Sequence, residues 1–251
     1  MIYDTEGSPF QELENLTFSL ENWLSFWYPK ICDYLGIDAE KDTDALLFTT
    51  LNYQSNVSED ELRKIIEGRE IIILAPGIKL EEEFNAFFSS SSLADKVVIC
   101  ADGATSFFAS KGLIPDIITS DIDGNVNDQI LAQRKGSILL LHVHGDNTDL
   151  VNQYIKEISK KKFMITTQSQ PVEGTFNFLG FTDGDRALCL ASIMNAKSIT
   201  LLGFDFGEKI GEFSKEKSLT ESMKERKMKK FAIAKSIINW SESSGLEIRF
   251  V

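Results

Sequence analysis

The amino-acid sequence predicts an α/β fold: an open, doubly wound and mostly parallel sheet, preceded by a small helical region. From residue 71 onward, short apolar segments alternate with amphipathic helical segments, which is typical of repeated strand–helix units. The apolar segments are nearly continuous, as parallel strands are when helices cover both faces of the sheet. Residues 1–68 lack this alternation, and their apolar side chains recur at the helical period instead.

The N-terminal region, residues 1–68, is therefore predicted to be helical. Ser58 and Glu61 have the spacing of a capping box, which satisfies free backbone N–H groups at the start of a helix. The sequence leaves open whether this region is separate or forms an additional helical layer on one core. The first helix is expected from apolar residues at helical spacing: Leu13, Leu16, Leu20, Trp23, Trp27, Ile31 and Leu35.

Residues 69–251 are predicted to form the α/β domain. In open α/β sheets, ligands bind beyond the carboxyl ends of the strands, so the residues that follow each strand are the candidates for a site. Helices are expected at about 79–90, 104–111, 126–135, 148–161, 184–196 and 219–243. Strands are expected at 70–75, 96–101, 116–121, 137–143, 163–167, 198–204 and 246–251.

Composition narrows the class of protein. A hydrophobic content of 43% is that of a globular chain, and a formal charge of −12 argues against a nucleic-acid binder. It does not argue against a nucleotide, because a divalent cation can join acidic side chains to phosphate. Apolar runs are too short for a membrane span, and the acidic start has no apolar signal segment. We expect a cytoplasmic protein with Cys32, Cys100 and Cys189 as buried free thiols.

Three successive predicted strands are followed by aspartate and glycine. Residues 101–149 hold seven aspartates and no glutamate, whereas a generic acidic surface would contain both. Aspartate keeps its oxygens close to the backbone, which suits a rigid Mg²⁺ site. Asp121 and Asp123 are expected on one side of an extended segment, where their charges repel unless a cation lies between them. A simple turn or a solvated acidic surface is the alternative for each group taken alone.

The two histidines, His142 and His144, precede another acidic segment. A His-x-His transition-metal site is disfavoured, because Asn147 follows Asp146 where a third histidine would be needed and the chain has no others. His142, deeper in the strand, is expected to form a structural hydrogen bond. His144, beside a glycine, is better placed to meet a ligand.

A second polar cluster follows the fifth predicted strand, and it includes Gln168 and Asn177. Thr182 or Asp183 is expected to cap a helix that begins near Asp185. The helix N-terminus together with Arg186 would bind an anion, although a capped helix with a surface ion pair is the alternative.

Three further segments have weaker signals. The Pro76–Gly77 turn and Asp205 also follow strands. The basic segment from Lys215 to Lys235 is interpreted as a solvated helix face. Contact of its lysine or arginine side chains with phosphates is the alternative.

These motifs together resemble a known family. In order, ADGA, GLIPDIITSDIDGN, HVHGDN, NFLGFTDGDRA and LLGFDFG resemble the archaeal 6-hydroxymethyl-7,8-dihydropterin pyrophosphokinases. They are more distantly similar to the thiamin pyrophosphokinases, which have a Rossmann-like sheet. The resemblance implies ATP and the pterin as substrates, Mg²⁺ as cofactor, and transfer of pyrophosphate that leaves AMP. The product would serve methanopterin or folate biosynthesis. Ser120 and Gly124 stand where the thiamin enzymes have glycine and serine, which points away from thiamin.

The resemblance also implies roles for individual residues. Asp121, Asp123, Asp146 and Asp149 would hold Mg²⁺, and the catalytic set would be Asp121, Asp123, His144 and Asp146. Substrate would contact Asp102, Gly103, Asn147, Gln168, Asn177, Thr182, Asp183, Asp185, Arg186 and Asp205. No membrane partner is expected, and the oligomeric state, a homodimer included, is left open.

Two other functions remain as hypotheses. Asp121–Ile122–Asp123 matches the Asp-x-Asp metal motif of glycosyltransferases that use nucleotide sugars. A non-catalytic nucleotide-binding protein would need the aspartates only to close turns.

Overall fold

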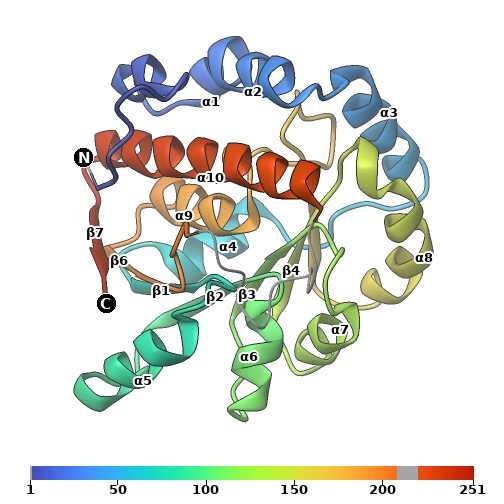
Figure 1. The fold of residues 1–251 in the computed structure, drawn as a ribbon. Coiled ribbons are helices and arrows are strands. Elements are labelled where there is room, and N and C mark those ends of the chain that lie inside the picture. The colour runs from blue at the N-terminus through green and yellow to red at the C-terminus, as the bar shows by residue number, and fades with distance from the viewer. Residues whose placement is uncertain (1, 208–219) are drawn as a thin grey trace.

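The computed structural model describes residues 2–207 and 220–251. Its centre is a seven-stranded, entirely parallel sheet with strand order β5-β4-β3-β2-β1-β6-β7. The chain builds the sheet outward from β1 to β5 and then returns to place β6 on the other side of β1 (Figure 1). The strands are β1 (Glu70–Leu74), β2 (Val97–Ala101), β3 (Ile117–Ser120), β4 (Ile138–His142), β5 (Phe163–Thr166), β6 (Ser198–Leu202) and β7 (Glu247–Phe250).

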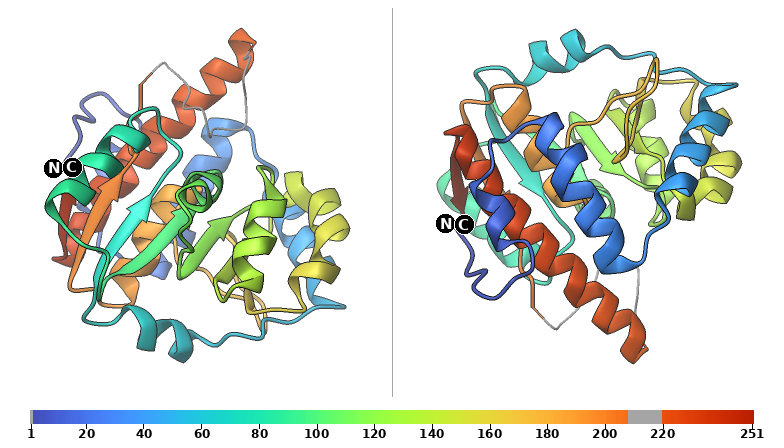
Figure 2. Two further views of the ribbon diagram at one scale, coloured as in Figure 1. Left: turned by 90° about the horizontal axis from the view of Figure 1, so that it is seen from below. Right: turned by 90° about the horizontal axis from the view of Figure 1, so that it is seen from above.

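Helices cover both faces of this sheet, which confirms the predicted doubly wound class (Figures 1 and 2). One face carries α5 (Leu80–Ser90), α6 (Ala104–Ser110) and α7 (Val126–Arg134). The opposite face carries α4 (Glu59–Ile66) and α9 (Asp183–Ile193), with α10 (Glu221–Ser241) packed on α9. The predicted start of the last helix, near residue 219, lies outside the described residues.

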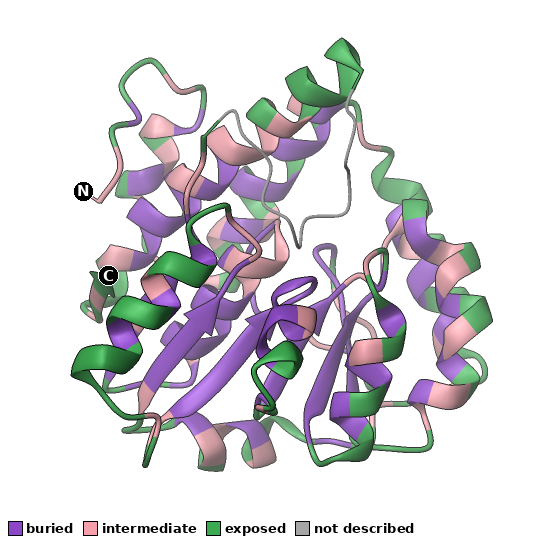
Figure 3. Ribbon diagram, turned by 60° about the horizontal axis from the view of Figure 1, so that its bottom comes forward, coloured by how far each residue is buried: buried purple, intermediate pink, exposed green. Residues whose placement is uncertain are grey.

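Alternation along β1 shows why the strands are apolar throughout. Ile71 and Ile73 pack with α4 and α9, whereas Ile72 and Leu74 pack with α5 and α6. Successive strand side chains point to opposite faces, and both faces of this sheet are covered. Strands β1 to β6 are accordingly almost entirely buried, as Figure 3 shows, whereas the edge strand β7 is mostly exposed.

The first predicted helix is shorter and less regular than its apolar spacing indicated. It begins at Leu20, because Ser19 accepts a hydrogen bond from Asn22 N and caps the helix. Leu13 instead belongs to the 3₁₀ helix η1 (Gln11–Asn15), and Leu16 is extended. After α1 (Leu20–Asn22) comes the π turn η2 (Trp23–Trp27), directly before α2 (Tyr28–Leu35). Pro29 lacks an N–H for the regular ladder, which favours such a change of helix type.

The N-terminal helices share hydrophobic clusters with the rest of the chain. Trp23 and Trp27 are fully buried and stack near Trp240 of α10, with ring centroids of Trp27 and Trp240 4.9 Å apart. The helix α3 (Ala39–Thr50) packs against α8 (Thr148–Ile158), and α4 begins with the predicted capping box. Figure 1 shows α2 lying along α10 as an outer layer.

Two expectations from composition can be compared with the structure. Cys32, Cys100 and Cys189 are buried and free, as predicted. Among the described residues, no helix combines the length and the apolar character that crossing a membrane requires.

Candidate active site at the carboxyl edge of the sheet

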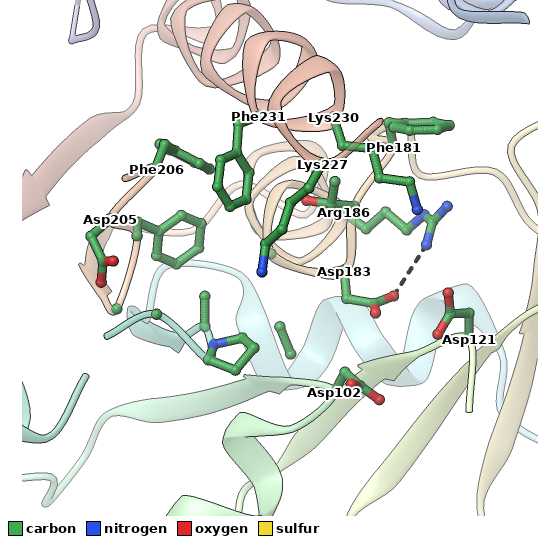
Figure 4. A pocket seen from close by; sticks show the side chains of 18 of the residues that line it. Asp102, Asp121, Phe181, Asp183, Arg186, Asp205, Phe206, Lys227, Lys230 and Phe231 are labelled. Atoms are coloured by element: carbon green, nitrogen blue, oxygen red, sulfur yellow. Dashed lines mark hydrogen bonds and ion pairs between the residues drawn. The ribbon is translucent and has the colours of Figure 1, made fainter. Parts of the chain in front are cut away.

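A cavity of about 450 Å³ lies beyond the carboxyl ends of β1, β2, β3 and β6, under α10 (Figure 4). It spans the switch point between β1 and β6, where ligands bind in open α/β sheets. Its acidic lining residues are Asp102, Asp121, Asp123, Asp183 and Asp205. Its basic ones are Arg186, Arg226, Lys227 and Lys230, and its aromatic ones are Phe181, Phe204, Phe206 and Phe231.

Three carboxylates meet on the floor of this cavity. Asp102, Asp121 and Asp183 each place an oxygen within 4.8 Å of the others. Burial raises the pKa of the Asp183 carboxyl well above its usual value, and the negative charge of Asp121 adds to the rise. Such repulsion is relieved by a proton or a cation, and an all-oxygen donor set is the kind that Mg²⁺ prefers. The residues present therefore fit a magnesium ion.

Strained backbone positions the first two of these carboxylates. Asp102 has φ of 40° and Ile122 has φ of 55°, in the left-handed region that non-glycine residues rarely adopt. Such strain persists where surrounding structure enforces it, and it is concentrated at functional sites. Asp102 Oδ1 accepts hydrogen bonds from Ser120 Oγ (3.0 Å) and Gln129 Nε2 (2.9 Å). A Cβ on Gly124 would lie 2.6 Å from Asp102 Oδ2, so any other residue there would force the carboxylate to shift.

The Asp121–Asp123 pair lines the cavity for a different reason from the one expected. The strand ends at Ser120, and the left-handed Ile122 turns the chain, so regular strand alternation does not place the two carboxylates. Both line the cavity, but Asp121 belongs to the three-carboxylate cluster whereas Asp123 is more exposed. The strain at Ile122 thus separates two neighbouring aspartates into different positions.

The third carboxylate comes from the N-terminus of α9 and not from the next strand. Thr119 Oγ1 donates to the backbone oxygen of Asp183 (2.9 Å), which fixes the start of α9 against β3. Arg186 Nη1 donates to Asp183 Oδ1 (3.1 Å), as the dashed line in Figure 4 shows. Asp185 accepts hydrogen bonds from Thr182 N and Phe181 N, so its carboxylate closes the cap of the helix.

The turn after β4 approaches the cluster from the other side. His144 Nδ1 accepts a hydrogen bond from Asp146 N (3.2 Å), so the neutral ring carries its proton on Nε2, which lies 3.6 Å from Asp121 Oδ2. Asn147 Nδ2 donates to the backbone oxygens of Asp121 and His142. His142 is buried, which lowers the pKa of its imidazole well below the usual value, and its Nδ1 lies 3.2 Å from Thr166 Oγ1.

The structure does not bring Asp146 and Asp149 into the carboxylate cluster. The chain leaves β4 through the 3₁₀ turn η3 (Gly145–Asn147) and enters α8, which directs both side chains to the surface. The Asp146 carboxylate is 75% exposed and lies 3.8 Å from Arg226 Nη2. Neither Asp146 nor Asp149 is among the described residues that line the cavity. Of the four aspartates that the resemblance implied for Mg²⁺, the structure places Asp121 in the carboxylate cluster and Asp123 in the cavity lining, and Asp102 and Asp183 complete the cluster.

The other predicted substrate residues divide into two groups. Thr182, Asp183, Arg186 and Asp205 line the cavity, although Asp205 also accepts hydrogen bonds from Ile78 N (3.1 Å) and Lys79 N (2.9 Å). Side chains buried behind the wall are those of Asn147, Gln168, Asn177 and Asp185, and Gly103 starts α6.

Several cavity residues were missed from the sequence. Lys227 and Lys230 of α10 point into the cavity in Figure 4, whereas the basic segment was interpreted first as a solvated face, with contact to phosphates as the alternative. Lys227 Nζ lies 5.5 Å from the ring centroid of Phe231, and Lys230 Nζ lies 6.0 Å from that of Phe181. The signal was the spacing of residues 227, 230 and 231, which share one helix face. Lys215 and Lys217 of the same segment lie outside the described residues.

Comparisons with known proteins agree with these motifs. Residues 49–211 match a family model described as 6-hydroxymethylpterin diphosphokinase MptE-like. Proteins named 6-hydroxymethyl-7,8-dihydropterin pyrophosphokinase are similar over most of their length. That of Methanocaldococcus jannaschii is 34% identical, covering 92% of this chain and 99% of the relative. That of Pyrococcus furiosus is 35% identical, covering 90% and 95%. That of Methanothermobacter thermautotrophicus is 32% identical, covering 89% and 95%.

A solved structure, that of the Maf glycosyltransferase from Magnetospirillum magneticum AMB-1, aligns with 61% of this chain and 27% of its own, at 15% identity. Its TM-score is 0.40, and no conclusion is drawn from that likeness. The family match covers most of the sheet and its site, and the relatives are matched nearly end to end. The chain therefore belongs to the MptE-like family of 6-hydroxymethylpterin diphosphokinases.

Proposed function

We propose that this protein transfers pyrophosphate from ATP to the hydroxymethyl group of 6-hydroxymethyl-7,8-dihydropterin, with Mg²⁺, giving AMP and the pterin diphosphate. The names of the relatives support the acceptor and the class of reaction. One observation of the structure carries the proposal. The same cavity is lined on one side by the carboxylates of Asp102, Asp121 and Asp183 and on the other by arginine and lysine side chains. The product would be consumed in the biosynthesis of a reduced pterin cofactor, methanopterin or folate.

Asp102, Asp121 and Asp183 are the residues that would hold Mg²⁺. The bound ion would neutralise oxygens of the triphosphate and hold them for in-line displacement. Hydrogen bonds from Ser120 and Gln129 fix the Asp102 carboxylate in advance. A fixed site of this kind needs no reorganisation at the moment of reaction.

The cationic wall would bind the phosphates. Arg186 is fixed by its hydrogen bond to Asp183, and its planar guanidinium suits bidentate contact with phosphate oxygens. Lys227 and Lys230 add positive charges from α10. Together these groups would hold the nucleotide's phosphates opposite the carboxylates, where charge develops in phosphoryl transfer.

The acceptor hydroxyl must lose a proton during the transfer. Asp123 lines the cavity beside the cluster without belonging to it, so we assign it the contact with that hydroxyl. The His144 ring lies beside Asp121, with Nε2 3.6 Å from its Oδ2, where it would help to orient that carboxylate. Phe204, Phe206 and Phe231 offer aromatic surfaces at the opposite end of the cavity, suited to a flat heterocycle.

The direct test is product analysis. Incubation with ATP, Mg²⁺ and the hydroxymethyl dihydropterin should give AMP and the pterin diphosphate in equal amounts, and chelation of Mg²⁺ should stop the reaction. Release of ADP, or no nucleotide product, would contradict the proposal. Calorimetry with ATP and with a UDP-sugar separates it from a glycosyltransferase, which would bind the sugar nucleotide more tightly.

A further inference from the structure

A buried carboxylate in the N-terminal region contacts two segments that lead to the site. Asp42 of α3 is 2% exposed. Its Oδ2 accepts hydrogen bonds from Tyr28 Oη (2.8 Å) and Gln168 Nε2 (2.6 Å), and its Oδ1 accepts one from Gly145 N (2.8 Å). Burying a carboxylate is costly unless its oxygens are satisfied, and these three donors do so. The Asp42 carboxylate therefore joins α3 to α2, to the turn after β4 and to the segment after β5.

The first branch runs through Gln168 to the carboxylate cluster. Gln168 Oε1 accepts a hydrogen bond from Arg186 Nη2 (3.1 Å), and Arg186 Nη1 donates to Asp183 Oδ1 (3.1 Å). A carboxylate only accepts and a guanidinium only donates, so the amide of Gln168 has one orientation that satisfies both. Trp23 Nε1 also donates to the backbone oxygen of Gln168 (2.8 Å), which fixes the residue at its other end.

The second branch runs through Gly145 to the opposite side of the cluster. A Cβ on Gly145 would lie 2.7 Å from Cβ of Lys41, so α3 abuts this turn closely. The preceding residue is His144, whose Nε2 faces Asp121 at 3.6 Å. The two branches thus end at Asp183 and Asp121, which are both members of the cluster.

We propose that Asp42 is a positioning residue for the reaction, and that the N-terminal helical region serves the site through it. Asp42 fixes the amide of Gln168, which directs the guanidinium of Arg186, and it fixes the turn that presents His144. The inference rests on the proposed function in that Arg186 meets the phosphates of the substrate. It assigns α3 a part in catalysis although α3 contributes no residue to the lining of the cavity among the described residues.

Asp42→Asn tests this with the full-length protein. An asparagine side chain has one acceptor oxygen, and its NH₂ group would face the donor of Gln168 or Gly145. Loss of one branch should lower kcat/KM for ATP by about tenfold to a hundredfold, the scale of a small misplacement of a reacting group. Tyr28→Phe is the matched control, because it removes one hydrogen bond to the same carboxylate and leaves both branches intact. Its kcat/KM should stay that of the wild type.

A double-mutant cycle separates positioning from general destabilisation. In a Gln168→Leu background the first branch is already broken, so Asp42→Asn should lower kcat/KM less than it does in the wild type. Equal reductions in the two backgrounds, with both variants folded by circular dichroism, would overturn the proposal. So would a Tyr28→Phe variant as impaired as Asp42→Asn.

A crystal structure of the Asp42→Asn variant gives a readout that needs no activity. Displacement of the Arg186 guanidinium from Asp183, or of the His144 ring from Asp121, is expected. An unchanged site in that structure would overturn the inference even if the variant has a lowered kcat/KM. Absence of AMP formation by the wild type would instead contradict the proposed function alone.

Discussion

The turns that follow β3 and β4 are both acidic, yet only the first contributes to the carboxylate cluster. After β3, Ser120 accepts a hydrogen bond from Ile122 N, and the left-handed Ile122 keeps Asp121 over the sheet edge. After β4, the chain forms a 3₁₀ turn and enters α8, so Asp146 is exposed. The position that β4 does not fill is taken by Asp183, which the chain reaches only after β5. The direction of the backbone after a strand, more than the local acidic sequence, decides which carboxylates meet.

The largest expected effect is the loss of activity when an aspartate of the carboxylate cluster is replaced, compared with replacement of an aspartate after β4. Asp121→Asn and Asp183→Asn should each lower kcat by about 10²-fold or more, because each removes a charge aimed at the ion and phosphates. Asp149→Asn should change kcat less than about twofold, since the Asp149 side chain is exposed at the surface. Steady-state kinetics at saturating Mg²⁺ measures all three. A severe loss in Asp149→Asn with little loss in Asp183→Asn would restore the ligand set expected from the sequence.

The turn after β3 can be perturbed without changing any charge. Gly124→Ala places a Cβ 2.6 Å from Asp102 Oδ2, so the carboxylate must move away from the cluster. A fall in kcat of about 10- to 100-fold is expected from such a displacement. Gly207→Ala is the control, because a Cβ there meets no atom of the described residues within 4 Å. The comparison would be wrong if the two alanine variants had equal kcat and equal affinity for Mg²⁺.

Helix α10 faces both turns, so replacing its basic residues one at a time tests which turn belongs to the site. Arg226 lies beside Asp146 and also lines the cavity, which Lys227 and Lys230 line as well. Lys227→Ala and Lys230→Ala should each raise KM for ATP by about threefold to tenfold, and more at low ionic strength. Lys229→Ala is the matched control on the same helix, since Lys229 pairs with Glu225 (3.3 Å). Initial rates over a range of salt concentrations would show whether the control behaves differently.

The smallest effect concerns stability without Mg²⁺. Burial and Asp121 raise the pKa of Asp183, so the folded protein binds a proton that the unfolded chain releases near pH 4. The contribution of this group to the free energy of unfolding is present at low pH and decreases as the pH rises toward the folded-state pKa. In Asp183→Asn this group does not titrate, so the free energy of unfolding no longer falls with pH on its account. The variant should melt a few degrees above the wild type at pH 7, about 2–4 °C for each 1 kcal/mol.

Thermal unfolding at pH 4 to 8, with and without Mg²⁺, checks this prediction. The difference in Tm between variant and wild type should grow with pH, and Mg²⁺ should reverse it by stabilising the wild type alone. A difference that does not depend on pH would mean that the Asp183 carboxyl carries no unfavourable charge in the folded protein.

The sequence by itself determined the sheet, because continuous apolar strands, helical periodicity and turn residues are local patterns. It also indicated two of the strand ends that line the cavity, since aspartate and glycine residues stand directly after strands β2 and β3. It correctly placed Arg186 near the start of a helix, because capping by Thr182 and Asp185 is a short-range signal.

Only the tertiary structure decided which groups share the cavity. Asp102 and Asp183 are 81 positions apart, and Lys227 and Lys230 come from the last helix, so no local spacing relates them. The left-handed conformations of Asp102 and Ile122 are also invisible in sequence, because contacts elsewhere in the fold enforce them. Chain direction after β4 and the contact of α3 with Gly145 are set by packing, which depends on the whole core and not on neighbours along the chain.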